Sequence, residues 1–377
     1  MKAKSVKGKT AGEIKAALEA NITNEFKPTL ATVFISAENE RETVCKILSE
    51  KNIQIFGSST GAEFTDGELE TDSIVILLLD INPNYFYLKL IESSPGTTKE
   101  TAEQIGSFGL SKFKKPAFLI VSGGLSTDGD EIAEGIKSSC GASSPVFGGL
   151  AADKLLFKRT YVFTNDMLTD HGLLALIVDE EKISIGGMAI GGWIPVGLEK
   201  TITRSNGNIV YSIDNEPAMD FIGRYTGLKN IDEKSAGDIL IRGNFQLQLK
   251  RENRPPVMRT PMQANLQDRS IVFAGSLPQG SKVRLCLLPG SEVIETTLNQ
   301  FSEYKKQQPE ADALIMFSCY GRKITLGPYM SEEIDGVKNI WNAPMAGFFC
   351  FGEIGRVVSG EYEFQNMTCS LAILKEK

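Results

Sequence analysis

The chain has 377 residues, of which 42% are hydrophobic and 23% are charged, and its formal net charge is −7. These values are typical of a globular protein with two or three domains, each large enough to bury a core. The acidic balance and the lack of a basic stripe argue against a nucleic-acid partner, and no apolar run reaches the length of a membrane span.

The first 28 residues are expected to form a helical extension. Met1–Thr10 is rich in lysine and has no apolar segment of signal-peptide type after it, so we expect a solvated, frayed end. A helix is predicted to begin after Thr10, because Thr10 and Glu13 have the spacing of a capping box.

The six cysteines and the single histidine limit the available chemistry. The cysteines include no C-x-x-C pair and lie mostly in apolar surroundings, which predicts reduced thiols in a cytoplasmic protein. His171 is expected to be structural, because a single histidine rules out most histidine-based zinc sites. We therefore expect no metal site and no cofactor.

A strand–helix–strand–turn–strand pattern occurs three times. Roughly thirty residues separate the first strand of each unit from its turn, a spacing typical of a structural repeat. A right-handed crossover should make the first two strands of a unit parallel. The predicted segments are Leu30–Ile35, Asn39–Lys51 and Ile74–Asp80 in the first unit, Ala117–Val121, Gly129–Cys140 and Leu173–Val178 in the second, and Ala313–Phe317, Ser331–Trp341 and Thr368–Leu374 in the third.

Each unit has a glycine-rich turn that ends near a carboxylate. Glycine permits positive φ and close approach, and successive backbone N–H groups can form an anion-binding concavity. Tight packing at a strand end explains any single turn, but three such turns favour a shared ligand pocket. The candidate ligand-binding residues are Gly57, Ser58, Ser59, Thr60 and Glu63 in the first turn, Gly148, Gly149 and Asp153 in the second, and Glu353 in the third.

Two other regions bear on organisation. The loop Ser122–Asp130 joins a strand to a helix N-terminus, where α/β folds place ligands, but it matches no nucleotide-binding motif. Beyond residue 182 the pattern becomes strand-rich, and Asn206–Gly207 predicts a hairpin. A helix should follow Asp214 and end at Gly227.

These elements predict an α/β fold with mixed sheets, outer helices and pseudo-symmetric strand-helix-strand units. Two sheets stacked between helices (αββα) are one form that such a chain could take, because the apolar strands require cover on both faces. We place a domain boundary within Leu198–Gly207, which divides the chain after its extension into domains 29–200 and 201–377.

Several motifs, in their order and spacing, resemble those of the FIST (F-box and intracellular signal transduction) family. They are Gly57–Glu63, Val146–Asp153 and Gly192–Gly197 for its N-terminal half, and Tyr211–Ala218, Phe317–Arg322, Gly352–Gly355 and Asn366–Thr368 for its C-terminal half. The resemblance implies a sensory domain that binds a small molecule, such as an amino acid. Family members are often fused to an output module. None follows Lys377 here, so we expect a separate signalling protein as partner.

Cys319, Arg322, Glu353 and Asn366 complete the candidate ligand-binding residues. Cys319 lies at a strand end beside Arg322, which could lower the thiol pKa and make it a nucleophile, but a small buried residue explains it more simply. Arg322 and Glu353 suit the two charges of an amino acid, and they suit a structural salt bridge equally well.

Three functions remain open from the sequence. A non-catalytic sensory domain that binds a small molecule is favoured first, a protein-interaction module second, and an enzyme with Cys319 as nucleophile third. The sensory hypothesis predicts that the three turns meet at one polar cavity lined by Ser59, Asp153, Arg322 and Glu353.

Overall fold

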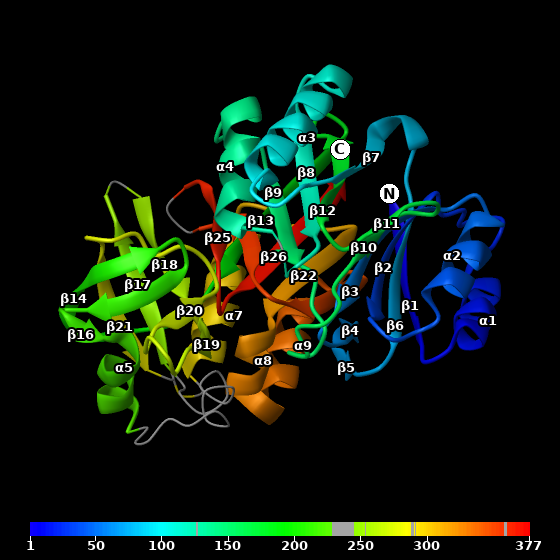
Figure 1. Ribbon diagram of the computed structural model, residues 1–377. Helices are drawn as coiled ribbons and strands as arrows, with labels where there is room; N and C mark the ends of the chain where they lie inside the picture. Colours follow the sequence, from blue (N-terminus) through cyan, green and yellow to red (C-terminus); the bar gives the residue numbers. More distant parts are fainter. Residues whose placement is uncertain (126, 228–244, 253, 288–289, 291, 358–359) are drawn as a thin grey trace.

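The structure is a computed structural model, and it describes residues 1–125, 127–227, 245–252, 254–287, 290, 292–357 and 360–377. Figure 1 shows two bodies: a larger one built from both ends of the chain, and a smaller strand-rich one formed by its middle part.

The larger body consists of three structural repeats. Each has an edge strand, a helix, a strand, a second helical segment, a strand, a two-stranded hairpin and a last strand. Repeat 1 contains β1 (Lys2–Gly8), α1 (Ala11–Asn21), β2 (Leu30–Ser36), α2 (Arg41–Ser49), β3 (Gln54–Thr60), β4 (Glu63–Thr65), β5 (Glu68–Glu70) and β6 (Ile74–Asp80).

Repeats 2 and 3 follow the same order, with a short 3₁₀ turn, Pro83–Tyr85, before repeat 2. Repeat 2 contains β7 (Phe86–Glu92), α3 (Thr98–Lys112), β8 (Pro116–Ser122), α4 (Gly129–Cys140), β9 (Val146–Leu150), β10 (Val162–Phe163), β11 (Leu168–Thr169) and β12 (Gly172–Asp179). Repeat 3 contains β13 (Ile183–Ile190), α7 (Glu292–Lys305), β22 (Ala313–Cys319), α8 (Tyr320–Leu326), a 3₁₀ turn (Gly327–Tyr329), α9 (Met330–Trp341), β23 (Met345–Cys350), β24 (Glu353–Arg356), β25 (Tyr362–Gln365) and β26 (Cys369–Glu376).

Local sequence signals explain several element ends. The Thr10 side chain accepts a hydrogen bond from the Glu13 backbone N–H, and the Glu13 carboxylate accepts one from the Lys9 N–H, which begins α1 with a variant of the predicted capping box. Asp128 caps α4 through the Asp130 N–H, and α4 ends at Gly141 with a φ of 79°.

The three repeats share one strand order and exchange their outer strands. The central strands run β6-β2-β3, β12-β8-β9 and β26-β22-β23, with the first two strands of each unit parallel as predicted. The hairpins cross between repeats: β4-β5 extends β23, β10-β11 extends β3, and β24-β25 extends β9. The edge strands β1, β7 and β13 pair with β6, β12 and β26. Each sheet is therefore completed on one side by the hairpin of another repeat and on the other side by the edge strand of its own repeat. The three repeats cannot separate without breaking strand pairs.

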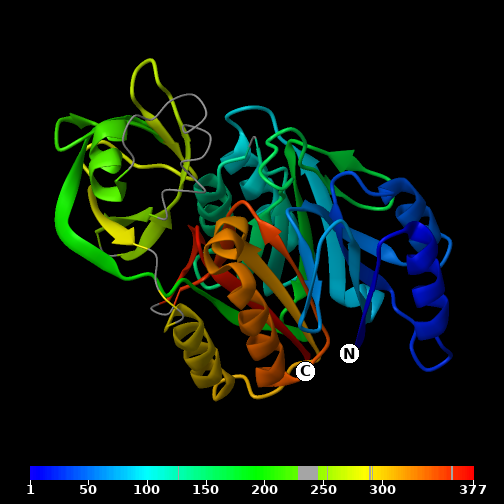
Figure 2. The same cartoon turned by 90° about the horizontal axis from the view of Figure 1, so that it is seen from below.

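One apolar core lies between the three sheets. It contains side chains from all three repeats, including Phe34, Phe147 and Phe317. On the outer faces, separate clusters bury α1 and α2, α3 and α4, and α7 to α9 against their own sheets. Figure 2 shows these helices on the outside of the sheets. Strands buried on both faces explain the almost unbroken apolar runs in the sequence.

The smaller body, which we call the inserted domain, interrupts repeat 3 between β13 and α7. It contains β14 (Pro195–Asn206), β15 (Ile209–Ile213), β16 (Glu216–Pro217), α5 (Ala218–Thr226), β17 (Phe245–Arg251), β18 (Arg254–Arg259), β19 (Pro261–Ala264), β20 (Ile271–Phe273) and β21 (Lys282–Leu287). Its strands join in one eight-stranded sheet around its own apolar core.

The predicted α/β class, mixed sheets, outer helices and repeated units are confirmed. The sheets number three around one core, where the αββα form has two. The lysine-rich end is not frayed. Lys2–Gly8 is strand β1, because it pairs along its whole length with β6. The expected boundary after residue 200 falls inside β14, and residues 292–376 return to the repeats.

Candidate functional site

The three glycine turns meet at the centre of the repeats. We call residues 57–63, 147–153 and 347–353 corners 1, 2 and 3. The Gly61 N–H donates to the Phe349 carbonyl at 2.9 Å, which joins corner 1 to corner 3. The Phe351 N–H donates to the Leu150 carbonyl at 3.0 Å, and the Ala152 N–H donates to the Ser59 carbonyl at 3.2 Å. Each corner is thus bonded to both others.

The meeting point is filled by protein atoms. A Cβ on Gly61 would lie 2.3 Å from the Tyr320 ring, and one on Gly149 would lie 2.9 Å from the Cys350 Sγ, so glycine is required at both positions by close packing. The Ser59 hydroxyl donates to the Ala152 carbonyl at 3.1 Å and accepts from the Tyr161 N–H at 3.0 Å. The serines and glycines of the corners therefore connect the repeats, and the two cavities described below are not lined by Ser59.

Glu63 and Glu353 occupy equivalent positions in corners 1 and 3, and both are fully buried. One oxygen of Glu63 accepts from the Ser73 hydroxyl at 2.8 Å, and one of Glu353 accepts from the Thr368 hydroxyl, also at 2.8 Å. The backbone N–H groups of Ser73 and Thr368 bond to the same oxygens. Each carboxyl therefore holds the residue that precedes the last strand of its repeat.

Burial sets the protonation of these carboxyls. Loss of solvation raises the pKa of Glu63 to about 7, although hydrogen bonds from Thr60 and Ser73 oppose the rise. Desolvation likewise raises the pKa of Glu353 well above its ordinary value, against hydrogen bonds from Thr368 and Cys350. A carboxyl held in this way is part of the fold and is not free to receive the ammonium group of a ligand.

Asp153 holds the equivalent position in corner 2 and has different partners. Its two oxygens accept from the backbone N–H groups of Phe157, Lys158 and Arg159 at 3.0, 2.6 and 2.9 Å. These bonds fold the loop after β9 over the end of the sheet, and that loop reaches the surface described below.

Arg322 and Glu353 are not paired with each other. The Arg322 guanidinium is fully buried, and it forms a salt bridge with Glu333, also fully buried. It also donates to the Gly191 and Met367 carbonyls at 2.6 and 3.2 Å and to the Thr297 hydroxyl at 2.9 Å. Of the two alternatives left open by the sequence, the geometry supports a structural salt bridge, with Glu333 as the acid.

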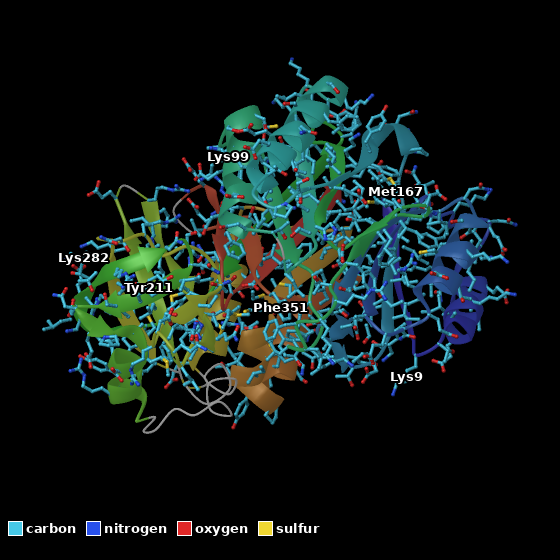
Figure 3. All side chains as sticks on the ribbon, in the orientation of Figure 1. Lys9, Lys99, Met167, Tyr211, Lys282 and Phe351 are labelled. Carbon is cyan, nitrogen blue, oxygen red and sulfur yellow. The ribbon has the colours of Figure 1, made fainter. Side chains whose placement is uncertain are left out.

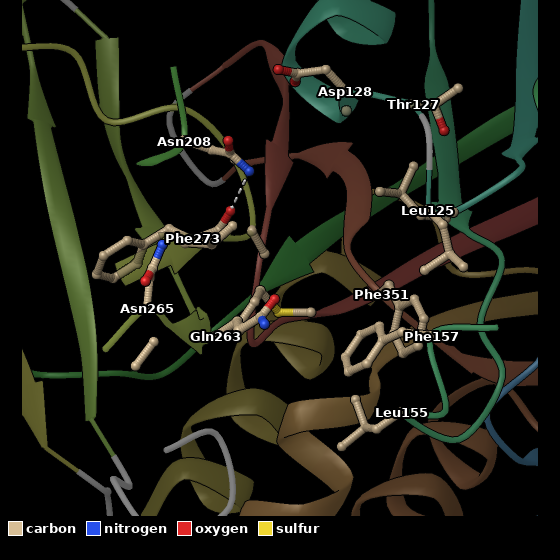
Figure 4. A pocket seen from close by; sticks show the side chains of 18 of the residues that line it. Leu125, Thr127, Asp128, Leu155, Phe157, Asn208, Gln263, Asn265, Phe273 and Phe351 are labelled. Carbon is tan, nitrogen blue, oxygen red and sulfur yellow. Dashed lines mark hydrogen bonds between the residues drawn. The ribbon is translucent and has the colours of Figure 1, made fainter. Parts of the chain in front are cut away.

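A large cleft separates the repeats from the inserted domain (Figure 4). Its volume is about 1330 Å³. On the repeat side it is lined by residues 124, 125 and 127–129 between β8 and α4, by Leu150 at the end of β9, by Leu155 and Phe157 after it, and by Phe351 and Phe364. On the other side it is lined by Asn208, residues 262–267 and residues 272–275. Corner 2 reaches the cleft through Leu150 and the loop after β9, and corner 3 reaches it through Phe351.

A small cavity of about 30 Å³ adjoins the cleft and shares Leu155, Met262, Ala274 and Phe351 with it. Its deeper wall includes Gln246 and Thr260 from the inserted domain, and Cys319 and Asn366 from repeat 3. The Asn366 side-chain oxygen accepts from the Thr260 N–H at 3.3 Å. The side-chain oxygens of Gln246 and Thr260 are buried and have no hydrogen-bond partner in the part of the chain that the structure describes.

Two family models match the chain: the FIST N domain over residues 29–216 and the FIST C domain over residues 218–356. The chain belongs to the FIST family. The FIST N match ends inside β16, so it includes repeat 2, most of repeat 1, β13 and the first strands of the inserted domain. The FIST C match begins at α5 and ends with β24, so β25 and β26 lie beyond it. FIST domains are sensory domains of signal transduction, so a sensory role is supported for this chain.

A curated relative is the uncharacterized protein MJ1623 of Methanocaldococcus jannaschii. It is 22% identical over 226 residues, which cover 54% of this chain and 41% of that protein. The match thus spans about two fifths of the relative's length.

Within the described ranges, no helix is both long and apolar enough to cross a membrane. The same residues contain no group of three or more histidine, cysteine, aspartate or glutamate side chains arranged to hold a metal ion. All six cysteines are free.

The FIST inserted domain is fastened to the repeats by arginines of β17 and β18. Arg259, almost fully buried, donates from Nη2 to both carboxylate oxygens of Asp130 at 2.7 Å. Arg251 and Arg254 both bond to the buried Glu363 of β25, at 2.9 and 2.7 Å. Asp130 follows the cleft-lining residues Asp128 and Gly129 directly, so the ionic contact lies at the rim of the cleft.

Of the sequence-predicted site residues, Cys319 and Asn366 line the small cavity. Neither described cavity is lined by Gly57, Ser58, Ser59, Thr60, Glu63, Gly148, Gly149, Asp153, Arg322 or Glu353. Residues 124, 125 and 127–129 of the Ser122–Asp130 loop, which was noted in the sequence for its place at a helix N-terminus, form part of one wall of the cleft. Residues 262–267 and 272–275 of the opposite wall had no recognisable motif, since they are ordinary strand and turn residues.

Proposed function

We propose that this FIST protein is a sensory module that binds a small molecule in the cleft between the repeats and the inserted domain, and that it signals through a separate protein. The observation that supports the proposal is the cleft itself. It has walls from two separately packed bodies, a volume suited to a small molecule, and both apolar and hydrogen-bonding side chains.

A ligand in this position would contact both bodies at once. The β8–α4 loop belongs to repeat 2, while Gln263 and Asn265 belong to the inserted domain, and Figure 4 shows them on opposite sides of the cleft. A molecule that bridges them favours one position of the inserted domain over others by its differential affinity. The Arg259–Asp130 ion pair at the rim joins the two bodies, so a change in the position of the inserted domain would strengthen or weaken it.

An enzymatic role for Cys319 has less support from the geometry. The thiol is fully buried, and desolvation together with the nearby Glu353 raises its pKa well above the ordinary value. Its sulfur lies 3.9 Å from the Met367 sulfur. Because the thiolate is the nucleophile, a thiol held protonated in this way is poorly suited to covalent catalysis. The alternative of a protein-interaction module is kept only in one form, in which the sensory module binds a partner protein to pass on its signal.

The test is a thermal-shift screen of amino acids and other small metabolites with a variant that fills the cleft. A ligand that binds only the folded state raises the melting temperature by mass action. Gln263 is an exposed cleft residue, so Gln263→Trp places an indole in the cleft without disturbing a core, and we expect it to abolish any shift.

The matched control is Lys282→Trp. Lys282 is exposed on the far side of the inserted domain, away from Phe351 and the cleft (Figure 3). This variant should bind as the unmodified chain does. If no compound shifts the melting temperature, or if both tryptophan variants respond equally, the cleft is not the ligand site.

A further inference from the structure

The described walls of the cleft carry almost no charged side chains. Of the lining residues that the structure describes, Asp128 is the only one with a side chain charged near neutral pH, and none is lysine, arginine or histidine. The small cavity is lined by no charged side chain within the described ranges. A carboxylate or phosphate in either place would lose its hydration without gaining a cation, which is costly.

Two residues that line the small cavity have side-chain oxygen atoms without hydrogen-bond partners in the described structure. Gln246 and Thr260 are each about 95% buried, with exposed fractions of 5% and 6%. The Gln246 Oε1 and the Thr260 Oγ1 have no hydrogen-bond partner among the described residues. A buried polar atom without a partner costs free energy that a ligand group can recover by bonding to it.

The volume of the small cavity limits the group that can enter. About 30 Å³ is room for one group of the size of a water molecule. An ammonium group would fit by size, but no carboxylate among the described lining residues balances its charge. A neutral hydroxyl can donate to the Gln246 Oε1 and accept from the Thr260 hydroxyl, and a primary amide can donate one N–H to each oxygen, without burying an unpaired charge.

The path from the small cavity to the cleft passes an aromatic surface. Phe351 lines both spaces, and its ring stacks on that of Phe157 with centroids 5.3 Å apart and planes at 29°. Phe157 is 41% exposed, so one side of this pair is open to the cleft. A flat apolar body resting there would place its tip at the cavity.

We propose that the ligand is an uncharged molecule with a flat apolar body and a small hydrogen-bond-donating tip, a hydroxyl or primary amide. The tip bonds to Gln246 and Thr260 in the small cavity, and the body lies on Phe157 and Phe351. This inference rests on the proposed function, since it specifies the ligand class of the same cleft. It differs from the amino acid suggested by family resemblance, whose charged groups have no partners in the small cavity.

The experiment compares four probes with one ring system: 2-naphthylmethanol, 2-naphthamide, 2-naphthylmethylamine and 2-naphthoate. Dissociation constants are measured by ligand-observed NMR titration of the full chain. The alcohol and the amide should bind at least tenfold more tightly than the naphthoate and the ammonium form, about the factor of one hydrogen bond. Equal binding of the naphthoate, or no binding by any probe, overturns the inference.

Thr260→Val provides the residue-specific arm. The Thr260 hydroxyl has no hydrogen-bond partner within the described ranges, so an isosteric methyl removes none of the described hydrogen bonds, and the melting temperature without ligand should stay the same or rise. Affinity for the alcohol should fall about tenfold. The control, Lys282→Ala, changes an exposed residue that lines neither the cleft nor the small cavity, and it should leave this affinity unchanged.

The two proposals fail in different ways. If Gln263→Trp abolishes binding of a metabolite but the probes show no preference for neutral donors, the cleft remains the site and the ligand class is wrong. If Thr260→Val leaves alcohol binding intact, the tip does not enter the small cavity. If Gln263→Trp affects nothing, the cleft itself is not the site.

Discussion

Corners 1 and 3 differ from corner 2, although all three have the same backbone course and a carboxylate at the same position. Glu63 and Glu353 are sealed between β-strands, and each bonds to the residue before the last strand of its repeat. Asp153 instead folds the loop that follows β9. Leu155 and Phe157 of that loop reach the cleft, and no equivalent loop follows β3 or β23, where the hairpin strand begins within a few residues.

The difference shows where a repeated fold can acquire a binding surface. Three equivalent corners around one axis fill the space between them, because each supplies the close-packed glycines and hydrogen bonds that the other two need. A hollow appears where one corner departs from the pattern and a foreign element, the inserted domain, lies against it. The ligand site is thus expected at the break in symmetry and not on the axis.

The largest expected effect is that of opening a sealed corner. Glu353→Ala leaves the Thr368 N–H, the Thr368 hydroxyl and the Cys350 thiol without their buried acceptor, and it creates a cavity. We expect a loss of about 4 kcal/mol in the free energy of unfolding, measured by urea denaturation. Glu353→Gln keeps the shape and one acceptor oxygen and should lose far less. A loss below about 1 kcal/mol for the alanine variant would mean that the corner is not sealed.

The next largest effect is the pH dependence of the free energy of unfolding that Glu63 causes. The pKa of Glu63 is about 7 in the folded chain against an ordinary value of 4.5, so the folded state binds this proton more tightly. The stabilising contribution of protonated Glu63 is therefore fully present below the unfolded pKa and is lost as the pH rises through 7. Glu63→Gln cannot titrate. The free energy of unfolding of the variant, relative to the unmodified chain, should therefore rise by about 3 kcal/mol between acidic and mildly alkaline pH.

That pH profile tests whether the Glu63 carboxyl is buried and protonated in corner 1. Parallel stability curves for Glu63→Gln and the unmodified chain across the pH range would contradict the assignment of a buried, protonated carboxyl in corner 1.

The smallest effect on stability is expected at the open corner. Asp153→Ala removes the acceptor for three backbone N–H groups. Asp153 is only 4% exposed, but these N–H groups belong to the exposed residues 157–159, so water can replace the carboxylate. We expect a loss of about 1 kcal/mol, as for a helix cap. The loop carries Leu155 and Phe157, so ligand affinity should fall more than stability does. A loss as large as that of Glu353→Ala would show that corner 2 is structural in the same way as the others.

The repeats could be predicted from the sequence because their strands are covered on both faces. Ile74–Asp80 and Gly129–Cys140 were expected with the bounds that the structure gives them, since a continuous apolar run and a capped amphipathic helix each leave a local signature. The pairing of Lys2–Gly8 with β6 left no such signature. Its alternating lysines resemble a solvated segment, and only a partner distant in the sequence makes them a strand.

The candidate site was harder to predict. Glycines and hydroxyls at strand ends suggested a pocket, but the same residues allow close packing, and the choice depends on what fills the space opposite, such as Tyr320 against Gly61. Arg322 and Glu353 were considered as partners, whereas the buried acid is Glu333, one helix farther along the chain. The cleft has a wall from each of two bodies, and no single stretch of sequence contains both.

The position of the inserted domain has a practical consequence. It enters repeat 3 at the joint between the edge strand and the first helix, and the same joint occurs after β1 and after β7. These two joints, residues 9–10 and 93–97, are surface connections in a scaffold whose strand pairs are already closed. A fluorescent protein inserted at either joint would be attached to the repeats by two chain connections, as the inserted domain is. The architecture thus provides two surface connections at which a fluorescent reporter domain can be inserted without interrupting a described strand or helix.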